Sequence, residues 1–429
     1  MRKNKKVPPK FKPIAAKVLL FIILVCFYLL VVNKWFIKGS FYSEYGADYL
    51  AYWSAGKIAD QYGYTEIYNL DKLETEQVQA LESLGIPLET EDSSFSILPV
   101  AYFSVFVVPF QILSKMDLVR GYWLWTVLNF ILMTGYLLYF LRSVFPEKDL
   151  FQKGLLLIVP ILFSYTVISN FAIGQVEVLL VICAGEFIRN ALNKKPFISG
   201  LWLGGMLIKP QVLILILPII LIMRNWKVFK GFLVTSAVLL GASFILSGFE
   251  GTKALINLWT VYSEGLSTGH PEAMINWRMV GLNLNQIFNI RLGWVITTVG
   301  IALTALALYF LVRRTPPLGS AAWVMTMLGI FSATLAITWH AHHHMGMVLI
   351  PFLLYASLKK LIPDNVFASW WLVTNIVWIL VVITNGLVNI YLGLDISEYI
   401  DFAVAFSGFA VNLFLLLVMV KTKKSMISK

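Results

Sequence analysis

Apolar runs separated by short polar segments dominate the sequence. A first run covers about 14–35. Twelve more follow, at about 96–113, 119–141, 154–171, 176–192, 197–208, 211–223, 228–247, 293–312, 319–338, 344–358, 367–388 and 402–420. Because about 20 apolar residues suffice for a helix to cross the hydrocarbon core of a bilayer, most of these runs are candidate transmembrane helices. The pattern predicts an all-α polytopic integral membrane protein.

Composition supports this prediction and excludes a water-soluble globule. Of the 429 residues, 59% are hydrophobic and only 13% are charged, whereas about 25% is typical of soluble domains. The net charge of +11 does not indicate a nucleic-acid partner, since the basic residues lie at the ends of apolar runs. Cys26 and Cys183 both fall inside such runs, so we expect neither a disulfide framework nor a Cys-based metal site.

The distribution of Lys and Arg predicts the orientation of the chain. A basic tail at 1–17 precedes the first run, and further basic clusters follow at Arg142/Lys148/Lys153, Lys194/Lys195, Arg224/Lys227/Lys230, Arg313/Arg314, Lys359/Lys360 and Lys421/Lys423/Lys424. All of them fall on one side if every run after 142 crosses once. That side is expected to be the cytoplasm, where short loops are rich in Lys and Arg.

Three runs lie between the tail and Arg142, so one of them does not cross. The run 96–113 is the best candidate, because it is short and contains Pro99 and Pro109. We therefore predict a single integral-membrane domain over 1–429, with about twelve crossings, both termini in the cytoplasm and external juxtamembrane helices. Large external loops are expected at 36–95 and 248–292.

The segment 41–69 is rich in aromatic residues around one central carboxylate, Asp48. Tyr49, Tyr52 and Trp53 offer aromatic faces that can stack on sugar rings, and an acid among them can accept a proton from a sugar hydroxyl. A structural interpretation remains open. Asp48 also stands where a helix over 49–61 would take an N-cap, and aromatic residues gather at membrane interfaces.

Ionisable residues inside apolar runs are costly and are therefore functional candidates. Lys209 lies at a Lys-Pro break between two runs too short to span the membrane, so we expect it at the floor of a cavity open to the outside. There it can bind a phosphate, snorkel, or pair with Glu177. The turn that holds Gln175 and Glu177 is expected on the same external side.

The same topology places all five histidines outside. They are His270, His340, His342, His343 and His344. A zinc site in 340–344 is one interpretation, but no Cys and no carboxylate stands at a ligand spacing. The simpler interpretation is that these imidazoles donate hydrogen bonds to a phosphate. We therefore predict no bound metal or other cofactor, and whether a divalent ion is needed stays open. Arg278 and the polar residues near it either contact phosphate and hydroxyl groups or form a solvated loop.

Motifs for nucleotide or nucleophilic chemistry are missing from the sequence. It contains no Gly-rich phosphate loop, Walker motif, Ser-His-Asp order or HExxH. ATP-driven transport within this chain is therefore not expected. Because no nucleotide pool exists outside the cell, a glycosyl donor on that side would be lipid-linked.

Four segments in order resemble glycosyltransferase family 87, the polyprenyl-phosphate-mannose-dependent mannosyltransferase-like group of the GT-C superfold. They are GADYLAYWSAGKIADQYGYTEIYN, NFAIGQVEVLLV, SGLWLGGMLIKPQVLILILP and TWHAHHHMGMVLIP. The resemblance implies that Asp48 is the catalytic base and that Lys209 and a late His face the donor phosphate. The chain departs from the family at Glu177, where Asn is frequent. It also departs in the Trp-x-His-His pattern after Trp339, which leaves the register of the functional His open.

The leading hypothesis is an inverting membrane glycosyltransferase of the plasma membrane. It would move a hexose, mannose by the resemblance, from a polyprenyl-phosphate donor to an external glycolipid or cell-envelope glycan. Asp48 would be the base, the donor phosphate would contact Lys209, Arg278, His342 and His343, and the substrates would contact Tyr49, Tyr52, Trp53, Gln175, Glu177, His270 and Trp339. The alternatives are a transporter or flippase of lipid-linked sugars and a noncatalytic assembly protein. The two halves of the sequence do not show the matched pair of broken helices that is typical of inverted-repeat transporters, which argues against the transporter.

Overall fold

The computed structural model describes residues 41–42, 45–86, 89–90, 93–94, 97–263, 270–394 and 396–427, together with eight positions between 19 and 33. The basic tail at 1–17 and nearly all of the first run at 14–35 lie outside the described residues. Parts of both large external loops lie outside them as well. The topology of these segments stays a prediction.

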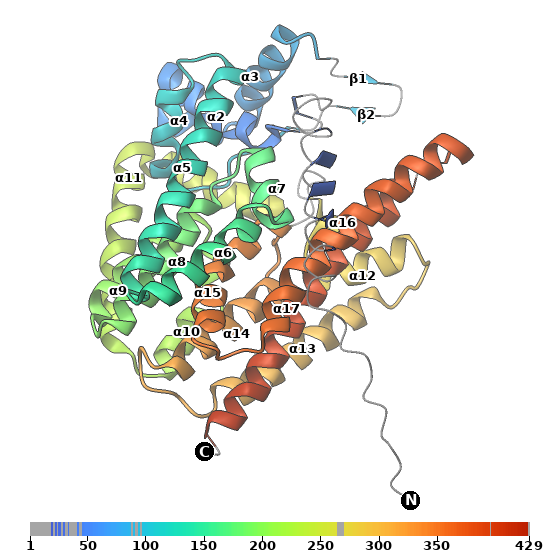
Figure 1. The fold of residues 1–429 in the computed structure, drawn as a ribbon. Coiled ribbons are helices and arrows are strands. Elements are labelled where there is room, and N and C mark those ends of the chain that lie inside the picture. The colour runs from blue at the N-terminus through green and yellow to red at the C-terminus, as the bar shows by residue number, and fades with distance from the viewer. Residues whose placement is uncertain are drawn as a thin grey trace, which may run out of the picture.

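The described chain is almost entirely helical (Figure 1). One end holds α2 (Ala47–Tyr62), α3 (Leu70–Ser83), α4 (Val108–Leu113) and a two-stranded antiparallel hairpin of β1 (Glu89–Thr90) and β2 (Ser93–Ser94). The bundle contains α5 (Leu118–Val144), α6 (Lys148–Leu162), α7 (Tyr165–Ile173), α8 (Glu177–Leu192), α9 (Pro196–Gly205), α10 (Ile216–Ile222), α11 (Trp226–Ser263), α12 (Trp277–Gln286), α13 (Gly293–Val312), α14 (Ala321–Ile337), α15 (Ile350–Leu358), α16 (Asp364–Leu392) and α17 (Ser397–Ile427). Short 3₁₀ turns lie at Tyr64–Glu66, Ser104–Val107, Met206–Ile208, Pro210–Leu213, Pro271–Ala273 and His343–Leu349.

Five helices of the described chain are long and apolar enough to cross a membrane: α5, α11, α13, α16 and α17. A sixth span results if α6 and α7, bent by 54° at a short break, count as one. The remaining apolar helices are shorter, such as α14 with 17 residues. A multi-pass helical membrane protein is thus confirmed, whereas the number of twelve crossings stays a prediction.

The core of the bundle lies around α14 and α15. Every residue of α15 is buried, as are the residues of α14 from Trp323 to Ala336. Small residues allow close packing elsewhere, as in other membrane helix pairs. Gly200 of α9 and Gly231 of α11 each lie against the backbone of the other helix. These contacts fix the helices whose ends form the cavity described below.

The run 96–113 contains only ten helical residues, Ser104–Leu113. At 1.5 Å per residue these cover about 15 Å, too little to cross the membrane. The segment packs on α2 instead, where Gly56 lies against the backbone of Phe110. Its length agrees with the juxtamembrane helix predicted there.

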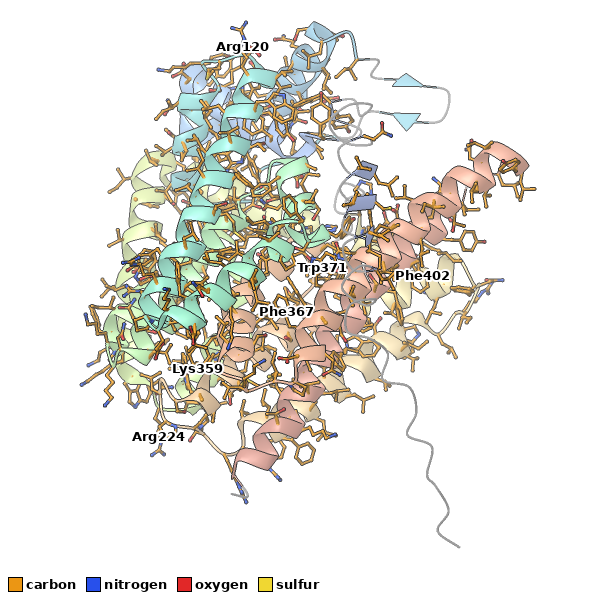
Figure 2. The ribbon with its side chains drawn as sticks, viewed as in Figure 1. Arg120, Arg224, Lys359, Phe367, Trp371 and Phe402 are labelled. Atoms are coloured by element: carbon orange, nitrogen blue, oxygen red, sulfur yellow. The ribbon has the colours of Figure 1, made fainter. Side chains whose placement is uncertain are left out.

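The basic turns gather at the end of the bundle opposite α2. Lys359 lies over the ring of Phe145 at 5.4 Å, and Gly319 packs on the backbone of Ala191. The first contact joins the α15–α16 and α5–α6 connections, and the second joins the α13–α14 connection to the end of α8. Figure 2 shows Arg224 and Lys359 at that end and Arg120 at the other. The arrangement agrees with the single basic side that the sequence predicts.

Candidate functional site

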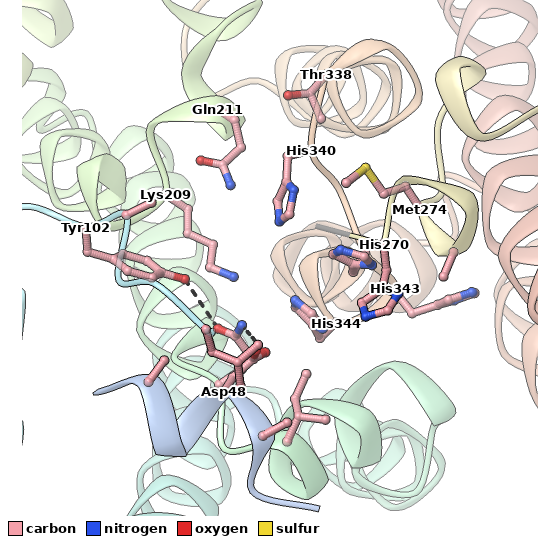
Figure 3. Close-up of a pocket in the computed structure, with 18 of the residues that line it drawn as sticks. Asp48, Tyr102, Lys209, Gln211, His270, Met274, Thr338, His340, His343 and His344 are labelled. Carbon is pink, nitrogen blue, oxygen red and sulfur yellow. Dashed lines mark hydrogen bonds between the residues drawn. The ribbon is translucent and has the colours of Figure 1, made fainter. Parts of the chain in front are cut away.

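A cavity of about 1070 Å³ lies between the start of α2 and the bundle. Its walls come from the first turn of α2, the loop at 98–103, the end of α7, the break around Lys209, and the segments 270–278 and 338–344. All five histidines line it, as the predicted topology requires of residues on one side. Figure 3 shows Lys209, His340 and His344 pointing into the same space as Asp48.

Asp48 lies in the first turn of α2 and lines the cavity. The alternative interpretation of Asp48 as an N-cap is wrong, because the helix begins at Ala47 and its N-cap is Gly46, with a φ of 75°. No side chain caps this helix. Burial raises the pKa of the Asp48 carboxyl, while the hydrogen bond from Gln175 and the charges of Lys209 and His270 lower it in part. A carboxylate with a raised pKa is a stronger base.

Gln175 links Asp48 to two tyrosines. Its Nε2 donates to Asp48 Oδ2 at 2.5 Å, and its Oε1 accepts from the Tyr52 hydroxyl at 2.7 Å. The Tyr102 hydroxyl lies 3.5 Å from the same Oε1 and 3.0 Å from the Tyr52 hydroxyl. The carboxylate is therefore held by a chain of hydrogen bonds that runs from the loop at 98–103 to α2.

Lys209 and Glu177 form a buried ion pair. Glu177 is fully buried in the first turn of α8, and Lys209 lies at the break between two 3₁₀ turns. The same carboxylate oxygen of Glu177 lies 3.4 Å from His344 Nε2. Lys209 also lies 5.9 Å from the Tyr102 ring and lines the cavity. The pairing with Glu177, one of the three alternatives open from the sequence, thus occurs in a lysine that also lines the cavity.

The imidazole rings of the segment 340–344 point to two different sides. The rings of His340 and His342 lie 4.9 Å apart, and those of His342 and His344 lie 5.7 Å apart, so these three stand side by side. The ring of His343 turns the other way and meets Tyr165 edge-on at 5.0 Å. Within the part of the chain that the structure describes, no three His, Cys, Asp or Glu side chains are grouped as metal ligands.

The segment 270–278 is attached to the histidine segment. The Ile275 amide donates to the Ala341 carbonyl at 2.7 Å, and Asn276 Nδ2 donates to the Thr338 carbonyl at 2.9 Å. Arg278 lies over the Trp339 ring at 4.0 Å. This stacking leaves a cation at the cavity wall.

His270 stands at the start of that segment and lines the cavity. Its Nδ1 lies 3.0 Å from Glu272 Oε1, and this contact raises the pKa of His270. An imidazole with a raised pKa carries a positive charge over more of the neutral pH range.

Three predicted substrate contacts are not at the cavity wall. Tyr49 is fully buried against Tyr122 at 5.9 Å, and Trp53 donates from its indole nitrogen to the Met116 carbonyl at 3.0 Å. Residues four apart share a helix face, so these two side chains lie together on the α4–α5 side, whereas Asp48 and Tyr52 lie together on the cavity side. Glu177 is covered by its ion pair and contacts Lys209 instead of the cavity.

The other predicted site residues do line the cavity: Asp48, Tyr52, Gln175, Lys209, His270, Arg278, Trp339, His342 and His343. The structure adds Tyr102, Gln211, Met274, His340 and His344 to the wall. No sequence pattern distinguishes Tyr102, which reaches the site through a non-helical loop. Gln211 follows Lys209 by two residues, so the Lys209-Pro210 break between two apolar runs is the feature of the sequence that could have indicated Gln211.

The fold and this cavity define a class of protein: a polytopic helical membrane protein with a polar, imidazole-rich site near one end of its bundle. A family model described as glycosyltransferase family 87 matches residues 101–338, more than half of the chain. The protein belongs to glycosyltransferase family 87, and the resemblance seen in the sequence is confirmed. It is therefore a membrane glycosyltransferase. The matched range includes Gln175, Glu177 and Lys209, whereas Asp48 and 340–344 lie outside it. No curated protein and no solved structure was found to match the chain.

Proposed function

We propose that the protein transfers a hexose from a polyprenyl-phosphate donor to a hydroxyl of an external glycolipid or cell-envelope glycan, with inversion at the anomeric carbon. The observation that carries this proposal is that Asp48 shares one cavity with Lys209, Arg278 and the imidazoles. A base and a set of phosphate-binding groups in one cavity are what a direct displacement at a sugar phosphate needs.

In the proposed step, the acceptor oxygen attacks the anomeric carbon from the face opposite the phosphate. The new carbon–oxygen bond forms as the bond to the phosphate oxygen breaks, and that oxygen leaves with the electron pair. Asp48 takes the hydroxyl proton. Lys209, Arg278, His342 and His343 stabilise the charge on the departing phosphate. A phosphate is a good leaving group, so no separate general acid is required.

The proposal includes the GT-C architecture, with about twelve crossings and the site on the extracytoplasmic side of the plasma membrane. Support comes from the basic turns, which lie at the end opposite the cavity, and from the lipid-linked donor that an external enzyme would need. Tyr52, Gln175, His270 and Trp339 also line the cavity. We propose that the reaction uses no cofactor besides its lipid-linked donor, and the transfer rate with and without a chelator decides whether a divalent ion is needed.

The test is to incubate purified protein with polyprenyl-phosphate-hexose and a glycolipid acceptor, and to measure released polyprenyl phosphate together with the glycosylated product. The proposal predicts equal amounts of both. Movement of the intact donor across a vesicle membrane without release would indicate the transporter or flippase. Release without a glycosylated product would indicate hydrolysis and contradict transfer.

A further inference from the structure

We propose that Gln175 and Tyr52 are positioning residues that hold the Asp48 carboxylate in place for proton transfer and do not bind the substrate themselves. This inference rests on the proposed function and changes the role that the sequence suggests for the two side chains. Both are more than nine-tenths buried, with 7% of Gln175 and 4% of Tyr52 exposed. They therefore offer little surface to a sugar.

The hydrogen-bond directions fix the orientation of the Gln175 amide. An amide has one accepting end and one donating end. The Tyr52 hydroxyl donates to Oε1 at 2.7 Å, so the NH₂ end faces Asp48, where it donates to Oδ2 at 2.5 Å. The opposite orientation would place an oxygen against the carboxylate. Because Oδ2 accepts from Gln175, we infer that Oδ1 is the atom that takes the proton from the acceptor hydroxyl.

The backbone around Gln175 is fixed as well. Gly174 ends α7 in the left-handed region, with a φ of 80°, and its carbonyl accepts from Trp125 Nε1 at 3.0 Å. The Gly46 amide donates to the Ala172 carbonyl at 2.7 Å, which joins the start of α2 to the end of α7. The distance between the Gln175 amide and Asp48 is thus set by the start of α2 and the end of α7, which are hydrogen-bonded to each other.

The surroundings of Asp48 give this hydrogen bond a measurable effect. Burial raises the pKa of the Asp48 carboxyl, and the Gln175 hydrogen bond is the largest opposing influence, ahead of Lys209 and His270. The other titratable groups around this carboxylate or on the same cavity wall are Tyr42, Tyr52, Tyr102, Tyr165, Glu177, Arg278, His340, His342, His343 and His344. Removing the Gln175 donor should raise the pKa of Asp48 further, so that the base becomes protonated at a higher pH.

The experiment compares kcat/KM against pH for the wild type, Gln175→Met, Tyr52→Phe and the double variant. On the acid side of the profile kcat/KM falls as Asp48 becomes protonated, and we call this part of the profile the acid limb. For Gln175→Met the midpoint of the acid limb should shift to higher pH by about one unit, because a hydrogen bond to a charged group is lost. For Tyr52→Phe it should move in the same direction by less. The double variant should match Gln175→Met alone, because Tyr52 acts through Gln175. Above the limb, each variant should approach the wild-type rate.

A second Tyr-Gln-Asp chain provides a matched control. The Tyr64 hydroxyl donates to Gln111 Oε1 at 2.6 Å, and Gln111 Nε2 donates to Asp60 Oδ1 at 3.4 Å. None of the three lines the cavity. Tyr64→Phe and Gln111→Met should therefore leave the pH profile in place.

Equal rate losses at every pH, or additive effects of the two substitutions, would contradict the positioning role while leaving the glycosyltransferase proposal intact. Titration of Asp48 by infrared difference spectroscopy against Asp48→Asn tests the same point without turnover. Gln175→Met should raise the titration midpoint of this carboxyl, and an unchanged midpoint would overturn the inference. A wild-type protein that releases no polyprenyl phosphate would contradict the proposed function instead.

Discussion

Lys209 and Glu177, 32 residues apart in the chain, form an ion pair at the edge of the cavity with 3% and 0% of their side chains exposed. The pair also involves His344, whose Nε2 lies 3.4 Å from the paired oxygen. Glu177 Oε2 is buried without a hydrogen-bond partner. Because an unpaired buried charge is costly, each ion depends on the other for its stability.

Breaking this pair should separate its effects on stability and on donor binding. Lys209→Met should destabilise the protein by roughly 3–5 kcal/mol, since it leaves Glu177 unpaired. Lys209→Met with Glu177→Gln should restore most of the melting temperature. Donor binding should stay weak in the double variant, because the phosphate still lacks its cation. Thermal unfolding in detergent and donor titration measure the two quantities.

The control is Arg189→Met, which breaks the 2.5 Å ion pair to Glu186 within α8, away from the cavity. It should lower the melting temperature without changing the dissociation constant of the donor. If the double variant at Lys209 and Glu177 recovers both stability and donor binding, Lys209 has no role toward the phosphate.

The affinity for the donor should depend on pH through His270. The contact with Glu272 raises the pKa of His270 above its usual value of about 6.5, so the imidazolium persists to higher pH. Binding of an anionic donor should weaken as pH rises through that raised pKa. The change should be less than about fivefold, because an exposed charge contributes up to about 1 kcal/mol. Glu272→Gln should move the transition to lower pH, and a transition that stays in place would contradict the assignment.

His342 should contribute more than His343 to the binding of the donor. His342 stands between His340 and His344 on the cavity side, whereas His343 packs edge-on against Tyr165. Phe at position 343 keeps an aromatic ring against Tyr165, so His343→Phe should weaken donor binding less than His342→Phe does. Titration of both variants with donor checks the order. A larger loss at 343 would mean that the phosphate lies on the Tyr165 side.

Much of the helix pattern could be predicted from the sequence. The run 293–312 coincides with α13, and the break at Lys209 does lie at the cavity, because short apolar runs cannot place their ends at the membrane surface. The phase of α2 could not be predicted. It depends on how the helix is rotated against its neighbours, and both the face with Asp48 and Tyr52 and the face with Tyr49 and Trp53 carry aromatic residues. Tyr49 and Trp53 were therefore assigned to the wrong side.

Contacts between distant segments were also beyond the sequence. Nothing near Tyr102 indicates that its hydroxyl lies 3.5 Å from Gln175, which is 73 residues away. The pairing of Lys209 with Glu177 was one alternative among three, because pairing depends on how α8 packs beside the break. Such contacts are set by tertiary packing and leave no periodic pattern.

Topology can be tested by cysteine labelling in a background with Cys26 and Cys183 replaced by Ser. Cysteines at Glu82 on α3 and at His270 should react with an impermeant reagent from outside. A cysteine at Lys195, in the exposed turn at the opposite end, should react only after the membrane is opened. Labelling at Lys195 from outside would contradict the predicted orientation.

The central claim is that Asp48 is the base, and Asp48→Asn tests it most directly. Asn keeps the shape of the side chain and an oxygen that can accept from Gln175, but it cannot take the acceptor's proton. Since Gly46 caps α2, the substitution removes no helix cap. Single-turnover transfer from polyprenyl-phosphate-hexose should fall at least about a hundredfold while donor binding persists. Transfer by Asp48→Asn at near the wild-type rate would contradict the account.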